Sequence, residues 1–323
     1  MQKRDFKAIG EVVKESRAAM EELSNLPPGA LTGLDTGFTR LNEITNGFQK
    51  KDLIVLAARP SQGKTSLALN IALNAAPKIT KGRDGNEGKA VVMIFSLEMP
   101  GKSIVQRLLS LQSGIEAKQI FNGHALRDTA AAIKLGEAAQ AISETKIFID
   151  DNSTIQIGEI WNKCRRLIHT EGKIDLIVID YLQLMDLGGN VKSSSRPENR
   201  QQEIATLTRM LKHLAGEMDC PVLLLSQVTR ESDKRSHKEH YLSDLRESGA
   251  IEQDADIVMF VYQENHPEGN ESDNIDAADP NTTRVLSIAK HRNGETGMIT
   301  LRWLGQYMKF ANYNRGDNVF DIV

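Results

Sequence analysis

Ala-Ala-Arg-Pro-Ser-Gln-Gly-Lys-Thr, residues 57–65, is the stretch that decides the fold. It follows an apolar run, residues 53–57, and precedes a helical pattern in which Leu67 and Ile71 share one side. A glycine-containing turn between a buried strand and a helix presents consecutive backbone N–H groups at the helix N-terminus, where the helix dipole also favours anions. The context therefore predicts a phosphate-binding P-loop.

The residue types in this loop predict a nucleotide with β- and γ-phosphates and Mg²⁺ as ligands. Lys64 is expected to reach the β- and γ-phosphates, and the hydroxyl of Thr65 is expected to bind the metal ion. Ala58 occupies a position where the general motif has glycine, so it must keep a negative φ for the loop to form. The residues predicted to bind the nucleotide are Arg59, Pro60, Ser61, Gln62, Gly63, Lys64, Thr65 and Ser66.

Three further polar residues follow apolar runs in the way that ligand-binding residues follow strands of an open α/β sheet. Asp180 ends the run 176–179 and is predicted to hold the metal ion, although capping of the next element is an alternative role. Glu98 follows the run 90–95 and is predicted to polarise the attacking water as a general base. Gln227 follows the run 222–225, where a neutral amide can sense a γ-phosphate without adding negative charge.

The order of apolar runs predicts an α/β fold with a mostly parallel, doubly wound sheet. Short, nearly continuous apolar runs are typical of strands that are covered on both faces, and helical patterns between them favour strand-helix units. The expected strands are residues 53–57, 90–95, 146–149, 176–179, 222–225 and 257–261. Near the C-terminus, the runs 285–289 and 298–303 flank residues 290–294 and predict an antiparallel hairpin.

An amphipathic helix is expected before this fold, at residues 5–24. Ile9, Val12, Met20 and their apolar neighbours recur at helical spacing between charged residues. Leu26, two prolines and a glycine follow and favour a linker. The predicted organisation is a linker helix and linker at residues 1–32 and an α/β domain with the P-loop at residues 33–323, with the apolar stripe covered either by the chain's own domain or by another subunit.

Composition excludes several classes of protein. The formal net charge of -3 over 323 residues is too close to balance for a histone-like binder, and two cysteines cannot build a disulfide framework. No apolar stretch approaches the roughly 20 residues of a membrane span, and the N-terminus is unlike a signal peptide. A cytoplasmic protein without membrane contact is expected.

Six ordered blocks together resemble the C-terminal motor of DnaB-type replicative helicases. They are residues 57–65, 96–99, 179–185, 226–227, 244–256 (DLRESGAIEQDAD) and 290–294. The resemblance extends from the linker helix near residue 9 to Trp303, and alanine at the position of Ala58 is common in that family. It implies a RecA-like P-loop ATPase that assembles as a homohexameric ring around single-stranded DNA, with ATP between adjacent subunits, and that unwinds duplex 5′ to 3′.

The resemblance also implies roles for individual residues. Glu98 would activate water, Gln227 would couple the γ-phosphate to DNA contacts, and Lys290 and Arg292, at the tip of the hairpin, would reach into a neighbour's site. Arg246, Glu247 and Gly249 resemble the family's DNA-binding loop, Glu247 more plausibly as a partner of a basic side chain. Arg196 and Arg200, in the polar stretch 188–202, line the same channel in one reading and are solvated loop charges in the other.

The family's helicase loader and primase are further partners implied by the resemblance. By the resemblance, we expect this sequence to hold the motor and the linker helix without the helical collar domain that recruits primase in the family. Two other functions compete with unwinding: a nucleotide-dependent DNA-binding ring that does not separate strands, and a strand-exchange recombinase. The recombinase shares the P-loop and Asp180 but gains no support from the block at residues 244–256.

Overall fold

The computed structural model describes residues 6–25, 27, 29–82, 85–180, 197–228, 242, 249–263 and 283–313. Its main element is a nine-stranded sheet with the order β11-β10-β9-β8-β1-β7-β6-β4-β5. Its strands are β1 (Leu53–Ala58), β4 (Val91–Ser96), β5 (Lys146–Asp150), β6 (Leu176–Asp180), β7 (Val222–Gln227), β8 (Ile257–Tyr262), β9 (Thr283–His291), β10 (Gly297–Leu304) and β11 (Lys309–Asn312). The strands β8, β1, β7, β6, β4 and β5 pair in parallel, which confirms the predicted doubly wound sheet.

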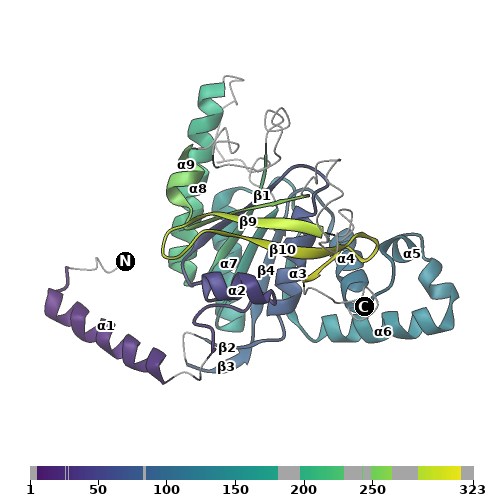
Figure 1. The fold of residues 1–323 in the computed structure, drawn as a ribbon, viewed down its shortest axis with the longest axis horizontal. Helices are drawn as coiled ribbons and strands as arrows, with labels where there is room; N and C mark the ends of the chain where they lie inside the picture. Colours follow the sequence, from purple (N-terminus) through teal and green to yellow (C-terminus); the bar gives the residue numbers. More distant parts are fainter. Residues whose placement is uncertain are drawn as a thin grey trace, which may run out of the picture.

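Helices cover both faces of the sheet (Figure 1), because side chains alternate between the faces along each strand. On one face, Ile54 and Leu56 of β1 pack with α2 (Thr39–Thr45), α3 (Lys64–Ala75) and α4 (Gly101–Ser113). On the other face, Val55 of β1 packs with α7 (Ile157–Glu171), α8 (Pro197–Met218) and α9 (Gly249–Asp254). The parallel strands direct their C-terminal ends to one edge, where the P-loop follows β1.

The C-terminal strands are antiparallel, as predicted, but they differ from the prediction in two respects. β9 pairs with both β8 and β10, and it extends to His291 because His291 and Lys290 still pair with Ile257 and Val258 of β8. Lys290 therefore lies in a strand, and the prediction that it belongs to the hairpin tip was wrong. A third strand, β11, pairs with β10 and was not predicted.

The start of α8 corrects the prediction of a polar loop at residues 188–202 in the part that the structure describes, residues 197–202. The helix begins at Pro197, so Arg200 lies in its first turn. Proline is favoured at the first helical position because its missing N–H has no partner there anyway, and its fixed φ suits the helix. The polar composition of these residues reflects the start of a helix that becomes apolar from Ile204 onward.

Smaller elements surround the sheet. The two-stranded sheet of β2 (Ile79–Lys81) and β3 (Glu87–Lys89) was not predicted. The elements α5 (Ala117–Phe121), η1 (His124–Arg127) and α6 (Thr129–Ser143) form a small lobe with its own apolar cluster, and η5 (Gly305–Tyr307) connects β10 to β11. Figure 1 shows α1 (Ile9–Ser24) apart from the sheet, and its Ile9 side chain is 78% exposed.

Among the described residues, no helix has both the length and the apolar character needed to span a membrane.

Candidate nucleotide-binding site

The P-loop closes tightly between β1 and α3. Ala58 ends β1 with a negative φ, while Ser61 (φ 66°) and Gly63 (φ 91°) take the left-handed conformation. A Cβ atom added to Gly63 would lie 2.9 Å from Cζ of Phe310 in β11, so both the φ and the close packing require glycine. The turn therefore directs the first N–H groups of α3 toward the carboxyl edge of the sheet, as an anion-binding site requires.

Lys64, Thr65 and Asp180 come together in the structure. Nζ of Lys64 lies 3.4 Å from Oδ1 of Asp180, and the hydroxyl of Thr65 donates a 2.7 Å hydrogen bond to Oδ2. Lys64 is 8% exposed and Asp180 is 4% exposed. Burial, which is the largest cause, lowers the pKa of Lys64, and the charges of Asp180 and Glu98 offset part of this shift.

These residues fit a nucleotide-bound Mg²⁺. A hydroxyl and a carboxylate are hard oxygen ligands of the kind that magnesium prefers, and Oδ1 of Asp180 is buried with the ammonium group of Lys64 at 3.4 Å. In the described part of the chain, no group of three or more His, Cys, Asp or Glu residues could hold a metal ion by itself. The geometry therefore suits a metal ion that takes its other ligands from phosphate and water.

A cavity of about 420 Å³ adjoins this loop, and most of the predicted nucleotide-site residues line it. Glu98, after β4, and Gln227, at the end of β7, both contribute to its wall, as do six of the seven P-loop residues from 59 to 65. Gln62 does not line the cavity: its Oε1 accepts a 3.0 Å hydrogen bond from the backbone N–H of Gln263, after β8. Arg59 also holds the chain, since its Nη1 donates to the backbone oxygen of Val228 at 3.2 Å.

The sequence reasoning missed Arg107, which lies on α4 and lines the same cavity. Its Nε is buried and has no hydrogen-bond partner in the described part of the chain. Burial lowers the pKa of Arg107, while Asp180 and Glu98 favour its charged form. The sequence signal that could have identified Arg107 was its position three residues after Ile104, which places it beside the apolar face of α4.

The sequence also did not predict that an aromatic side chain lines the cavity. Trp303 of β10 lines the cavity, and its ring centroid lies 4.6 Å from that of Phe310. Both residues come from the antiparallel strands, more than 230 residues after the P-loop in the sequence. No local pattern could place them there, because the contact depends on the order of strands in the sheet.

Lys290 and Arg292 lie at the opposite end of the sheet from this cavity, since β9 reaches them beside Ile257, at the start of β8. The ammonium group of Lys290 donates to the backbone oxygens of Glu252, Gln253 and Ala255, where α9 ends. A lysine has three N–H donors, so these oxygens account for all of them. Neither Lys290 nor Arg292 contributes to the nucleotide pocket of its own chain.

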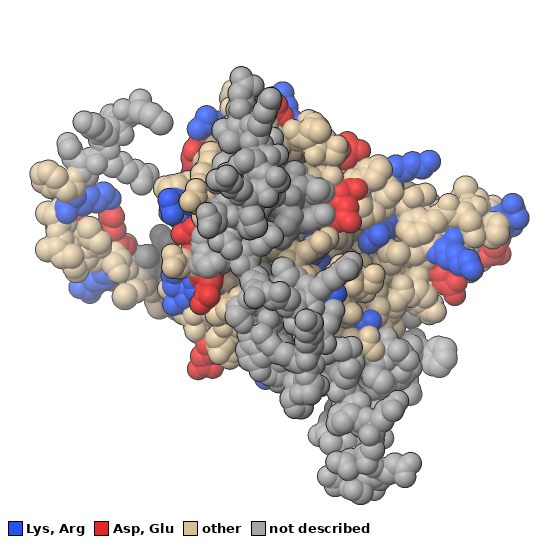
Figure 2. Space-filling view, turned by 90° about the horizontal axis from the view of Figure 1, so that it is seen from above, with Lys and Arg blue, Asp and Glu red and all other residues tan. Residues whose placement is uncertain are grey.

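The predicted DNA-binding residues fall mostly outside the described part of the chain. Arg196, Arg246 and Glu247 lie outside it, Arg200 is placed only as part of α8, and Gly249 begins α9. Figure 2 shows basic and acidic side chains interspersed over the described residues of the face it presents. Surface charge there does not identify a DNA path.

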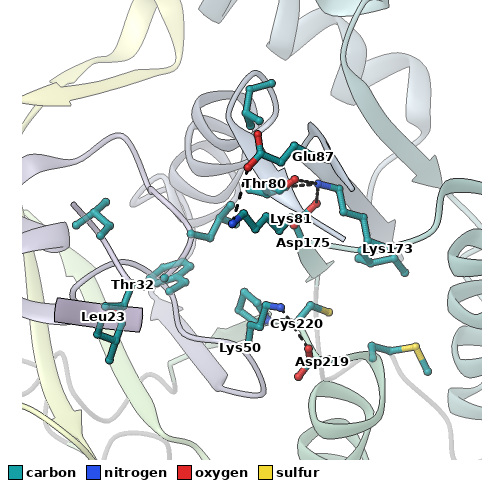
Figure 3. A pocket seen from close by; sticks show the side chains of 18 of the residues that line it. Leu23, Thr32, Lys50, Thr80, Lys81, Glu87, Lys173, Asp175, Asp219 and Cys220 are labelled. Carbon is teal, nitrogen blue, oxygen red and sulfur yellow. Dashed lines mark hydrogen bonds and ion pairs between the residues drawn. The ribbon is translucent and has the colours of Figure 1, made fainter. Parts of the chain in front are cut away.

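A larger cavity of about 1000 Å³ lies at the other edge of the sheet, where β6 and β7 begin. Its lysines face carboxylates: Nζ of Lys173 lies 3.4 Å from Asp175, and Nζ of Lys50 lies 3.3 Å from Asp219 (Figure 3). Lys173 also donates to the backbone oxygens of Thr80, at 2.7 Å, and Gly88, at 3.0 Å. These contacts hold the β2–β3 hairpin, so the lysines of this cavity serve the fold rather than an anion.

Asp52, just before β1, provides a test of the electrostatics at this end of the sheet. Burial and the charge of Asp256 raise its pKa from 3.8 to about 6, against the opposing effects of Lys212 and Arg292. The folded state therefore binds the proton more tightly, and stability falls as the pH rises from about 4 to 6. We expect Asp52→Asn to raise the free energy of unfolding at pH 8 by about 1–3 kcal/mol, measured by urea denaturation, and to change it little at pH 3.5.

Asp35 provides a control because its pKa is shifted in the opposite direction to that of Asp52. Burial alone would raise its pKa, but hydrogen bonds with Lys78, Gly37 and Asn42 outweigh this effect and lower it. The stability that Asp35 contributes is present above its unfolded pKa and is lost as the pH falls through its folded pKa. Asp35→Asn should therefore lower the free energy of unfolding at pH 8, and an Asp52→Asn variant that behaved in the same way would contradict the assignment.

The family model of the DnaB-like helicase C terminal domain matches residues 33–312. The replicative DNA helicase DnaB of Geobacillus stearothermophilus is 41% identical over 310 residues, which are 96% of this chain and 63% of that protein. The replicative DNA helicase DnaC of Bacillus subtilis (strain 168) shows the same identity and coverage. The chain thus spans less than two thirds of the length of these relatives.

Two solved structures resemble the fold closely. One is an ATPase domain with a TM-score of 0.79 and 32% identity, with 96% of this chain and 100% of that chain covered. The other is a DnaB-like replicative helicase, studied for its interactions with primase, with a TM-score of 0.78 and 31% identity, and with 97% of this chain and 69% of that chain covered.

Proposed function

Because the chain belongs to the family of DnaB-like helicase C-terminal domains, we propose that it is an ATP-driven motor that translocates 5′ to 3′ on single-stranded DNA and unwinds duplex at a replication fork. The observation that carries this proposal is the contact of Lys64 and Thr65, which line the cavity, with the buried carboxylate of Asp180. Residues 1–32 serve as the linker and residues 33–323 as the motor.

In the proposed reaction, the P-loop N–H groups and Lys64 bind the β- and γ-phosphates of ATP. Thr65 and Asp180 would hold Mg²⁺, which would neutralise phosphate charge. Glu98 accepts a proton from the water that attacks the γ-phosphorus, and ADP leaves with the bridging oxygen. Gln227, beside Ala58 in the sheet register, senses whether the γ-phosphate is present.

Arg107 adds a positive charge to the same pocket. Its guanidinium lies close enough to Asp180 and Glu98 for their charges to affect its pKa. Lys64 and Arg107 together bring two positive charges to a pocket in which the phosphates of ATP would meet the carboxylates of Asp180 and Glu98. We assign Arg107 to stabilisation of the charge that develops on the transferred phosphoryl group.

We propose that another copy of the chain completes the site. Arg292 lies at the end of the sheet opposite the cavity of its own chain, so a part in hydrolysis would take it into the cavity of a neighbour. An arginine supplied in this way stabilises transition-state charge and is worth about 10³- to 10⁵-fold in rate. We propose a homohexameric ring with ATP between subunits, in which Lys290 holds the end of α9 beside Arg292 and the apolar stripe of α1 packs on an adjacent motor.

DNA would pass through the ring and contact the segment before α9. Arg246 and Gly249 grip phosphates without reading sequence, Glu247 supports a basic side chain, and Arg196 and Arg200 are further candidates for the channel. A helicase loader is a further proposed partner. Primase is proposed only for a chain joined to a collar domain, as the primase interaction named for one structural relative suggests.

The test uses a forked DNA with a 5′ single-stranded tail. We expect DNA-stimulated ATP hydrolysis, strand separation, and a particle mass of six chains with a non-hydrolysable ATP analogue. A fork with only a 3′ tail is the control and should not be unwound. DNA binding and ring formation without strand separation would favour the non-unwinding ring, and formation of joint molecules would favour a recombinase.

A further inference from the structure

Asp256 joins three elements at the end of the sheet that lies away from the nucleotide pocket. Its Oδ2 accepts a 2.8 Å hydrogen bond from the backbone N–H of Leu53, at the start of β1, and also accepts from the ammonium group of Lys212 on α8. Its Oδ1 accepts a 3.1 Å hydrogen bond from Nη1 of Arg292. The Asp256 side chain is only 5% exposed.

In the described part of the chain, the hydrogen bonds of Arg292 go to Asp256 and Gln253. Its backbone N–H donates to the backbone oxygen of Asp256 at 2.8 Å, and its Nη2 donates to the backbone oxygen of Gln253, in α9, at 2.7 Å. A guanidinium has five N–H donors, of which these side-chain contacts use two. The side chain is 46% exposed, so the rest of the group can meet a second partner while the first contacts persist.

We propose that Asp256 is a positioning residue for ATP hydrolysis, because it fixes the guanidinium of Arg292 in the orientation in which that group enters the site of an adjacent copy. This inference rests on the proposed function, in which Arg292 acts on a neighbouring subunit. A free arginine side chain has many rotamers and loses entropy when one is fixed, and a misplacement of about 1 Å can cost about 100-fold in rate. A buried carboxylate that already holds the guanidinium reduces both the loss of rotamer entropy and the misplacement before the subunits meet.

The alternative is that Asp256 only stabilises the fold through Leu53 and Lys212. The two roles differ in what they do to the chain's own pocket. A structural defect would pass along β1 to the P-loop and weaken ATP binding, whereas a loss of positioning would leave the P-loop intact and slow only the chemical step in the neighbour.

The test is Asp256→Asn, which keeps the shape and one acceptor oxygen but removes the charge. We expect kcat for DNA-stimulated hydrolysis to fall about 10- to 100-fold, with less than a twofold change in KM for ATP. Lys212→Met is the matched control, since it removes the other cation from the same carboxylate, and it should keep kcat within twofold. The double variant Asp256→Asn, Arg292→Ala should be no slower than Arg292→Ala, because the two residues act as one unit.

Several outcomes would overturn the inference. If Arg292→Ala loses turnover while Asp256→Asn keeps it, Asp256 does not position the arginine. If Asp256→Asn slows the Arg292→Ala variant further, or raises KM strongly, its role is structural. If Arg292→Ala keeps full turnover, the proposed trans role itself fails. Where Asp256→Asn alone does not fold, Asp256→Asn combined with Lys212→Met removes the unmatched lysine charge, and the same three readings apply.

Discussion

Replacement of Lys64 by alanine should lower DNA-stimulated ATP hydrolysis by about 10²- to 10³-fold or more, as expected when a preorganised charge is removed from a water-poor site. The lysine is 8% exposed and its ammonium group lies 3.4 Å from Asp180, so the pocket already holds it where phosphate oxygens would arrive. Strand separation should be lost with it. The measurements are phosphate release with single-stranded DNA and unwinding of a 5′-tailed fork.

Lys78→Ala provides the matched control for Lys64→Ala. Lys78 lies shortly after the end of α3, and its exposed ammonium group pairs with Asp35 at 2.8 Å. Loss of this surface pair should cost at most about 1 kcal/mol of stability and leave turnover unchanged. Equal hydrolysis by Lys64→Ala and the unaltered chain would refute the assignment of the P-loop, and with it the proposed reaction.

The second large effect is expected from Arg292→Ala, which should lower kcat by about 10³-fold or more and leave the KM for ATP nearly unchanged. The reason is geometric: Arg292 lies beside the start of β8, whereas the P-loop follows the end of the parallel strand β1. The variant's own phosphate contacts therefore stay intact. Arg165→Ala, which removes a surface arginine paired with Glu217, is the control and should keep full turnover.

Mixed rings give an independent check of this composite site. A Lys64→Ala subunit has a disabled pocket but an intact Arg292, and an Arg292→Ala subunit has the reverse. Where the second subunit's pocket faces the first subunit's arginine, one complete site forms, so the mixture should hydrolyse more ATP than the two proteins measured separately. Full turnover by Arg292→Ala alone would show that the arginine has no part in the reaction.

Much of the fold could be predicted because five of the parallel strands, β1, β4, β6, β7 and β8, are buried on both faces and read as nearly unbroken apolar runs. All eight predicted strands are present, with ends within two residues of the prediction. The strands that were missed are short or half-exposed: β2 and β3 have three residues each, and β11 has four. Their sequences carry too few alternating residues to distinguish them from loops.

The residues of the candidate site could likewise be predicted where strand ends place them, and could not where packing places them. Lys64, Thr65, Glu98, Asp180 and Gln227 follow strands whose ends meet at one sheet edge, so topology alone brings them together. Arg107 and Trp303 depend on how a helix and an antiparallel strand pack over that edge, which no local pattern encodes. The roles of Lys290, Arg292 and the DNA-binding residues came from the family resemblance and stay predictions.

The position of Trp303 on the wall of the cavity gives the protein an optical reporter of its own. The chain has two tryptophans, and the other, Trp161, donates a hydrogen bond to Glu217 on the surface of α8, away from the pocket. Replacing Trp161 with phenylalanine would leave a single indole, packed against Phe310 beside the phosphate loop. Its emission would then follow the arrival and departure of nucleotide in real time without any attached dye.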